Sequence, residues 1–276
     1  MSYKTILVHI DSGKRCAKRL ETAIQLARKY DAYLVGLYSF SPYIPPGYIM
    51  AHMGEEIVAA QNKIAVESML RAEEVFHKQT SSAGLEKIEW HTAYDDPVHA
   101  MSLRAQYADI VVIGQSDSSD DSGVAMDFPE RLVLTAGRPV LILPNTGDFS
   151  SIGKRILVAW NASQEATRAV SNSITLLRSA GRVFVVTVNS KASKNGSIPN
   201  ENIIRYLERL GVRAELKESY GVEIDVGNEL LSRASGLDAD LIVMGCYGHS
   251  RLKEWVLGGA TRTILESMTI PVLMSH

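Results

Sequence analysis

The sequence is poor in features that mark several large protein classes. Its 276 residues include two cysteines, Cys16 and Cys246, too few for a disulfide framework or a zinc site. Lysine and arginine (29) nearly balance aspartate and glutamate (31), so no basic excess favours nucleic acid. No apolar run approaches the ~18–20 residues of a membrane span, and no leader-like segment precedes the first strand-like run. We therefore expect a cytoplasmic protein with reduced thiols and with neither a membrane nor a nucleic acid as its partner.

Motifs of common nucleotide-dependent and hydrolytic enzymes are missing too. The sequence contains no Gly-x4-Gly-Lys-Ser/Thr, no Gly-x-Gly-x-x-Gly after its first strand and no Gly-x-Ser-x-Gly. This argues against a P-loop NTPase, an ordinary NAD enzyme and an α/β-hydrolase. Four histidines, His52, His77, His91 and His99, are scattered and are better explained as lone surface residues than as metal ligands.

What the sequence does contain is an internal duplication. The matching blocks, in chain order, are Lys4–Asp11 with Lys154–Asn161, Tyr33–Tyr38 with Val183–Val188, Ala108–Gly114 with Ala239–Gly245, and Arg138–Ile142 with Ile270–Met274. Four matches in one order predict two copies of one domain, at residues 1–147 and 152–276, joined by a turn-rich linker. The first two blocks are offset by 150 positions and the third by 131, so the first copy has 19 extra residues between them.

Each copy alternates β-branched runs with amphipathic helical stretches, which predicts a doubly wound α/β fold with a parallel sheet. In the second copy we expect strands near 155–160, 182–188, 213–219, 240–245 and 271–275, and helices near 163–179, 199–210, 225–236 and 260–268. The extra length of the first copy falls in residues 41–79, with a turn at Pro42, Pro45 and Pro46 and then a long helix from about Glu55 to Gln79.

Ligands of doubly wound sheets bind beyond the carboxyl ends of the strands. The loops after the first and fourth strands of the second copy are therefore candidates, at residues 161–163 and 245–250, the latter continuing to 258–261. Two glycine turns, one of them ahead of a helix N-terminus, offer backbone N–H groups and a positive dipole end to a phosphate. From spacing alone, tight turns and close helix packing explain these glycines equally well.

The pattern Gly245-x2-Gly248-x9-Gly258, after an apolar strand and before Pro271-Val-Leu, resembles the nucleotide-binding signature of the universal stress protein family. The tandem arrangement resembles the two-domain members of that family. The resemblance implies two Rossmann-like, adenine nucleotide hydrolase-like domains with five-stranded parallel sheets, often paired through the last strand. It also implies binding of ATP or AMP without a dedicated catalytic apparatus.

The resemblance assigns site residues only in the second copy. Those expected around the phosphates are Gly245, Gly248, Gly258, Gly259 and Ala260; Ala159, Trp160 and Asn161 would lie beside the ribose and adenine, Val188 and Met244 beside the base, and His249, Ser250 and Thr261 nearby. Gly259 stands where the family has Ser or Thr. Asn161 stands where the family has Asp, so it brings no charge for a metal and an accompanying Mg²⁺ is left open.

The first copy departs further from the pattern. Asp117 takes the place of Gly248, and its loop, residues 115–130, is acidic. The five carboxylates between Gly114 and Arg131 are Asp117, Asp120, Asp121, Asp127 and Glu130, with no Lys or Arg among them. Such a loop repels a polyphosphate. A solvated loop is favoured over a calcium site, because EF-hand spacing is missing.

The sequence thus favours a non-enzymatic stress-response protein that binds an adenine nucleotide in its second domain. A slow ATP hydrolase or nucleotide transferase, and an apo scaffold with a vestigial pocket, remain alternatives. The strands at Pro139–Leu143 and Pro271–Met274 are expected to pair antiparallel as a pseudo-two-fold pseudodimer, which covers an exposed sheet edge. Further homodimerisation is left open, and the 41–79 segment is the expected surface for an unknown protein partner. A redox role for Cys246 would require an exposed thiol of low pKa.

Overall fold

A computed structural model of the chain describes residues 2–41, 47–117, 119, 124–149, 151–188, 201–220, 225–246 and 259–276, and within residues 47–61 it describes one side chain, that of residue 60. The chain divides into two compact units, which we call the N-terminal unit (residues 3–136) and the C-terminal unit (residues 137–276). Each unit is described by itself.

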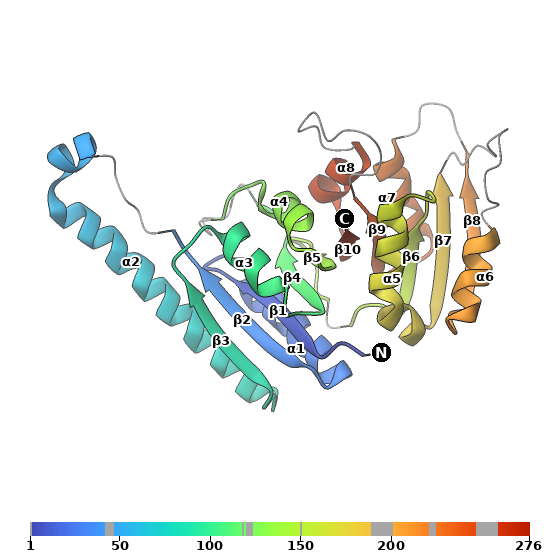
Figure 1. Cartoon of the computed structure of the whole chain (residues 1–276), viewed down its shortest axis with the longest axis horizontal. Coiled ribbons are helices and arrows are strands. Elements are labelled where there is room, and N and C mark those ends of the chain that lie inside the picture. The colour runs from blue at the N-terminus through green and yellow to red at the C-terminus, as the bar shows by residue number, and fades with distance from the viewer. Residues whose placement is uncertain are drawn as a thin grey trace. The chain divides into compact units, whose positions relative to one another are not determined.

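The N-terminal unit alternates strands and helices along the chain. Its elements are β1 (Thr5–Ile10), α1 (Cys16–Tyr30), β2 (Tyr33–Ser39), α2 (Gly47–Ser82), β3 (Ile88–Ala93), α3 (Pro97–Ala105), β4 (Ile110–Gly114) and α4 (Phe128–Thr135). The strands form a parallel sheet in the order β3-β2-β1-β4. Helix α1 packs beside α2, and α3 beside α4, and Figure 1 shows α2 and α3 on opposite faces of this sheet.

The C-terminal unit repeats the same alternation after one additional strand. Its elements are β5 (Val140–Leu143), β6 (Arg155–Ala159), α5 (Gln164–Ser179), β7 (Arg182–Val188), α6 (Glu201–Arg209), β8 (Ala214–Ser219), α7 (Val226–Gly236), β9 (Leu241–Gly245), α8 (Gly259–Ser267) and β10 (Val272–Ser275). The strand order is β5-β10-β9-β6-β7-β8, in which β5 alone is antiparallel to its neighbour β10. The expected antiparallel pairing of the two last strands is therefore confirmed.

Burial explains why these runs become central strands. Residues 110–113 of β4 and 241–243 of β9 are fully buried, as expected for parallel strands covered on both faces. Helices begin at residues that satisfy their first backbone N–H groups. The side chain of Asp96 accepts from two amides of α3, Ser163 Oγ accepts from the Ala166 amide in α5, and Asp225 Oδ1 accepts from the Asn228 amide in α7. The α/β fold of mostly parallel strands is thus confirmed.

Two details of the sequence prediction are wrong. Helix α2 begins at Gly47 rather than near Glu55 and ends at Ser82, so it spans 36 residues against nine in α6; Figure 1 shows it extending well past the sheet. The offset between β2 and β7 is 149 rather than 150, because Leu7 pairs with Val35 while Leu157 pairs with Phe184. Counted from the buried helix residues Ala27 and Leu177, which are 150 positions apart, the stretch to Tyr33 in β2 is one residue longer than the stretch to Arg182 in β7. The Pro42, Pro45 and Pro46 turn lies outside the described residues.

No helix in the described part of the chain is long and apolar enough to cross a membrane.

Candidate functional site

The carboxyl edge of the C-terminal unit brings together the ends of three neighbouring strands. Strand β6 pairs with β7 on one side and with β9 on the other, all parallel, so the ends of these strands meet at one edge. Nine of the residues expected at the site are described, namely Ala159, Trp160, Asn161, Val188, Met244, Gly245, Gly259, Ala260 and Thr261. The other four, Gly248, His249, Ser250 and Gly258, lie outside the described residues.

The loop after β6 is held by local hydrogen bonds. The Trp160 amide donates to the Val186 carbonyl (2.9 Å), which continues the β6–β7 pairing by one residue. Asn161 Oδ1 accepts from the Ser163 amide (3.1 Å), and Ala162 between them adopts a left-handed φ of 60°. Ser163 then caps α5. Asn161 is exposed, and the Ser163 bond uses only its carbonyl oxygen, so within the described residues this bond leaves the side-chain NH₂ as a donor.

Gly245 and Gly259 are glycines for different reasons. A Cβ on Gly245 would lie 2.4 Å from the Glu165 carbonyl carbon and 2.5 Å from the Ala166 nitrogen, so the start of α5 packs directly on the end of β9. A Cβ on Gly259 would meet no described atom within 4 Å. Close packing therefore accounts for Gly245, whereas no packing among the described residues requires the glycine at 259, where α8 begins.

The first turn of α8 suits an anion. It contains no acidic residue, and its N-terminal amides carry the positive end of the helix dipole. Thr261 is buried, with 4% of its surface exposed. Arg262 Nε donates to Glu266 Oε1 (2.7 Å) on the exposed side of the helix.

Cys246 follows β9 and is buried rather than exposed. Its amide and its Sγ both donate to the Ser275 carbonyl, at 3.0 and 3.3 Å. Burial, and secondarily the nearby charge of Glu165, raises the pKa of the Cys246 thiol far above its usual value. The redox hypothesis required the opposite, an accessible thiol of low pKa.

Glu165 was missed in the sequence analysis. It lies in the first turn of α5 and contacts the end of β9, where a Gly245 Cβ would also touch its Cβ at 2.8 Å. The negative charge of its carboxylate is the second cause, after burial, of the raised pKa of the Cys246 thiol. Its position four residues after Asn161, at the start of the helix that follows the first strand, is the signal that could have identified it.

The same edge of the N-terminal unit is occupied by its own charged side chains. Arg19 is 5% exposed; its Nη2 lies 2.7 Å from Asp11 Oδ2, and its Nε donates to the His9 carbonyl (2.8 Å). The other Asp11 oxygen accepts from the Gly13 amide (2.9 Å). Burial opposes the charge of Asp11, but Arg19 and His9 hold its pKa below the usual value. A Cβ on Gly114 would meet Arg19 Nη1 at 2.6 Å.

His9 is buried in the middle of this network. Its ring lies 4.7 Å, centroid to centroid, from the ring of Phe128 at the start of α4, and its Nδ1 is 3.5 Å from Asp11 Oδ2. Within the described part of the chain, its Nε2 has no hydrogen-bond partner. Burial lowers the pKa of His9 to about 4, against the opposing effect of Asp11. His9 is therefore neutral at pH 7.

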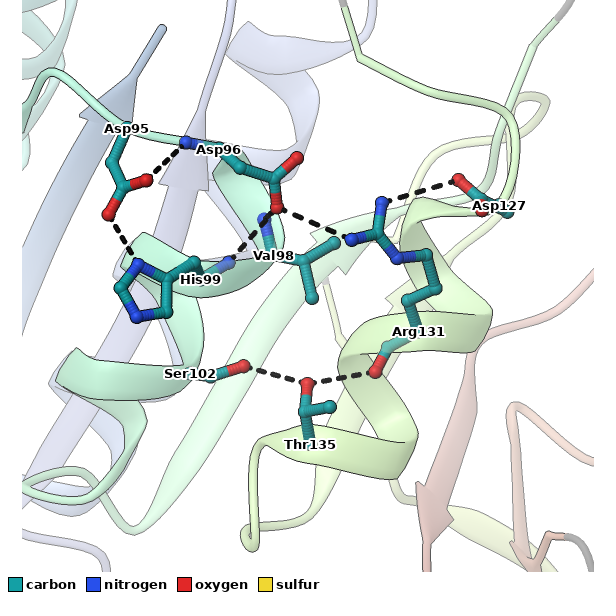
Figure 2. Close-up of polar contacts among 8 residues, drawn as sticks. All are labelled: Asp95, Asp96, Val98, His99, Ser102, Asp127, Arg131 and Thr135. Atoms are coloured by element: carbon teal, nitrogen blue, oxygen red, sulfur yellow. Dashed lines mark hydrogen bonds and ion pairs between the residues drawn. The ribbon is translucent and has the colours of Figure 1, made fainter. Parts of the chain in front are cut away.

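Helix α4 begins with residues that do not suit an anion. Asp127 precedes it, Pro129 lacks an N–H, and Glu130 lies in its first turn. Figure 2 shows how this end is tied to α3: Arg131 lies between Asp127 (3.9 Å) and Asp96 (3.6 Å), the residue that caps α3. The same figure shows Ser102 and Thr135 joined through their hydroxyls at 2.7 Å, and His99 bound to Asp95.

Asp117 forms its hydrogen bonds, within the described residues, with its near neighbour Ser119. Its Oδ1 accepts from the amide and the hydroxyl of Ser119, at 2.8 and 2.7 Å, which lowers the pKa of this exposed carboxyl. Asp120 and Asp121 lie outside the described residues. Across the described residues, no group of three or more His, Cys, Asp or Glu side chains could hold a metal ion.

Repeated strand–helix alternation around parallel sheets defines a tandem α/β protein of Rossmann-like type. The profile of the universal stress protein family matches residues 2–144 and again residues 153–276. The chain therefore belongs to the universal stress protein family and carries its domain twice.

Individual relatives agree with this assignment. A universal stress protein of Synechocystis sp. is 30% identical over 151 residues, 52% of this chain and 49% of that protein, so the match spans about half of that relative. The crystal structure of a universal stress protein from Archaeoglobus fulgidus aligns with a TM-score of 0.72 at 16% identity, covering 98% of this chain and 97% of the other. A functionally unknown protein from Pseudomonas aeruginosa aligns with a TM-score of 0.59 at 18% identity, over 99% and 92% of the two chains. These structures establish the likeness of fold.

Proposed function

We propose that the protein binds one adenine nucleotide, ATP or AMP, at the carboxyl edge of the C-terminal unit and acts in the stress response without catalysing a reaction. The observation that carries this proposal is the start of α8. A helix N-terminus free of acidic residues opens with a glycine that packing among the described residues does not require, at the end of the loop that carries the family's glycine pattern.

The residues at this edge suit a nucleotide by their chemistry. Amides at the start of α8 would bind phosphate oxygens, as would those of the glycine loop. Asn161 would donate a hydrogen bond to the ribose, since its NH₂ group is available. Val188 and Met244, at the ends of β7 and β9, supply apolar contacts for the base. A bound Mg²⁺ would have to be held mainly by the phosphates, because position 161 brings no charge.

The simplest test is to denature the purified protein and analyse the released small molecules by chromatography and mass spectrometry. The proposal predicts an adenine nucleotide, or, if none is retained, saturable binding of added ATP or AMP in calorimetry. Absence of both would favour the scaffold with a vestigial pocket.

One observation favours a slow ATP hydrolase as the second candidate. Glu165 lies against the end of β9, next to Cys246, and is a carboxylate of the kind that could orient an attacking water. Hydrolysis above background that disappears in Glu165→Gln, while ATP binding persists, would establish this alternative. Under the main proposal, parent and variant show the same background rate.

A further inference from the structure

The two units can be compared position by position at this edge because their strands pair in the same register. Strand β1 pairs with β4 through Ile6–Ile110, and β6 pairs with β9 through Ile156–Leu241, with the same steps following in each pair. His9 therefore holds in β1 the place that Ala159 holds in β6.

Helices α4 and α8 can be aligned in the same way by what they bury. Three buried residues in α4 and just after it match three buried residues in α8 and just after it, each 132 positions further along the chain. The pairs are Leu132 with Ile264, Val133 with Leu265, and Ala136 with Met268. The next strands keep this offset, because β5 begins at Val140 and β10 at Val272. Phe128, which opens α4, therefore corresponds to Ala260.

At these two positions the N-terminal unit has large aromatic rings and the C-terminal unit has alanines. In the N-terminal unit the rings of His9 and Phe128 are in contact and only 1% and 3% exposed, respectively. In the C-terminal unit both positions are alanine, half-buried, with one methyl group each.

A third position, on helix α1, also has a large residue in the N-terminal unit and a small residue in the C-terminal unit. Arg19 lies against Gly114 and forms an ion pair with Asp11. With the offset of 150 positions that relates the two units here, its counterpart is Ala169. Its ion-pair partner Asp11 corresponds to the uncharged Asn161. Residues on the first strand, on the helix after it and on the helix after the fourth strand all change from large or charged to small or neutral. The changed residues form two contacting pairs in the N-terminal unit, His9 with Phe128 and Arg19 with Asp11, and both pairs lie at the edge where ligands of such sheets bind.

We propose that Ala159 and Ala260 are the specificity-determining residues that leave room for a nucleotide at the edge of the C-terminal unit, and that His9 and Phe128 fill the equivalent space in the N-terminal unit. This inference rests on the proposed nucleotide function. Under this inference, the N-terminal unit binds no nucleotide for two reasons: the rings of His9 and Phe128 occupy the space, and the loop at residues 115–130 is acidic.

The test introduces the rings of one unit into the other. Ala260 is replaced in a graded series, Ala260→Ser, Ala260→Val and Ala260→Phe, and Ala159→His is made separately; each full-length variant is titrated with ATP by calorimetry. We expect ATP binding to weaken with the volume of the new side chain, least in Ala260→Ser, more in Ala260→Val, and about 100-fold in Ala260→Phe, a change of two decades in Kd. Glu266→Phe, on the exposed side of the same helix, is the matched control and keeps the parent affinity.

Thermal unfolding without ATP identifies any variant that fails to fold, and the series then rests on the smaller substitutions. If the parent binds ATP and folded Ala260→Phe and Ala159→His bind equally well, the volume inference is wrong while the proposed function stands. If the parent binds neither ATP nor AMP, the proposed function fails and this inference fails with it.

Discussion

The two units share a strand framework and differ at the edge where ligands of such sheets bind. Strands β1 and β4 pair in the same register as β6 and β9, so the backbone places equivalent positions alike. In one unit those positions hold a buried ion pair and two contacting rings, and in the other they hold alanines and an asparagine. The comparison teaches that the two units keep one apolar strand pattern while the residues at this edge differ in size and charge, and our proposal is that this difference decides which unit accommodates a nucleotide.

The largest expected effect comes from exchanging one loop residue between the units. Gly248→Asp introduces the residue of the N-terminal unit, Asp117, into the glycine loop. A like charge ~4 Å from a phosphate at an effective dielectric near 20 costs about 4 kcal/mol before relaxation, or almost three decades in Kd. The matched change Asp117→Gly leaves ATP binding unaltered. Calorimetry of both variants checks this, and parent-like binding by Gly248→Asp would show that the site is elsewhere.

Removing the buried guanidinium of the N-terminal unit should destabilise that unit alone. Arg19→Met leaves Asp11 buried without its ionic partner, at a cost of about 3–5 kcal/mol in the free energy of unfolding. Hydrogen exchange of amides in β1 and β6 reports the two units separately. We expect faster exchange in β1, partly restored in the double variant Arg19→Met with Asp11→Asn. Unchanged exchange in β1 would mean that the ion pair contributes little.

Acid should weaken the N-terminal unit through His9. Because burial lowers the pKa of His9 from 6.5 to about 4 in the folded protein, the unfolded chain binds the proton first as pH falls. Stability is therefore complete above pH 6.5 and is lost between about pH 6.5 and 4, by about 3 kcal/mol.

The measurement is chemical unfolding at several pH values, compared with His9→Leu, in which this loss disappears. Asp11, whose pKa is lowered from 3.8, contributes its own loss only below that range. Equal pH dependence in parent and His9→Leu would contradict the assignment.

A smaller difference is expected between the two glycines that end β4 and β9. In Gly245→Ala the new Cβ meets backbone atoms of α5 at 2.4 and 2.5 Å, so the helix has to shift, at a cost of about 1–3 kcal/mol. In Gly114→Ala the new Cβ meets the end of the Arg19 side chain at 2.6 Å, which can move more easily. Thermal unfolding should show the larger loss for Gly245→Ala, together with weaker ATP binding. The reverse order would show that Arg19 is the more rigid neighbour.

Much of the fold could be predicted from the sequence, because apolar periodicity reports strands and helices directly. The helix predicted near 225–236 is observed at Val226–Gly236, and the strand predicted at 182–188 is β7 itself. The start of α2 was missed because Gly47 and Gly54 interrupt its first turns with residues that disfavour helix. The one-residue shift between β2 and β7 arises where the helix ends and the chain enters the strand, and the period of the apolar residues does not report where a helix ends.

The site is predictable only in part, for a physical reason. The glycine pattern and the ends of strands are local signals. The His9–Phe128 contact joins residues 119 positions apart, and the Arg19 pair depends on where a helix face meets a strand end. Local hints did exist, since His9 interrupts an apolar strand and Arg19 lies on the buried stripe of α1. Neither hint reveals the partner, because that requires the packed structure.

The most direct measurement of the central claim is the stoichiometry of ATP binding to the intact chain, by native mass spectrometry with calorimetry on the same sample. An edge open in the C-terminal unit and filled in the N-terminal unit predicts one ATP per chain, reduced to none in Gly248→Asp and kept at one in Asp117→Gly. Two ATP per chain, or one that survives Gly248→Asp, would contradict the account.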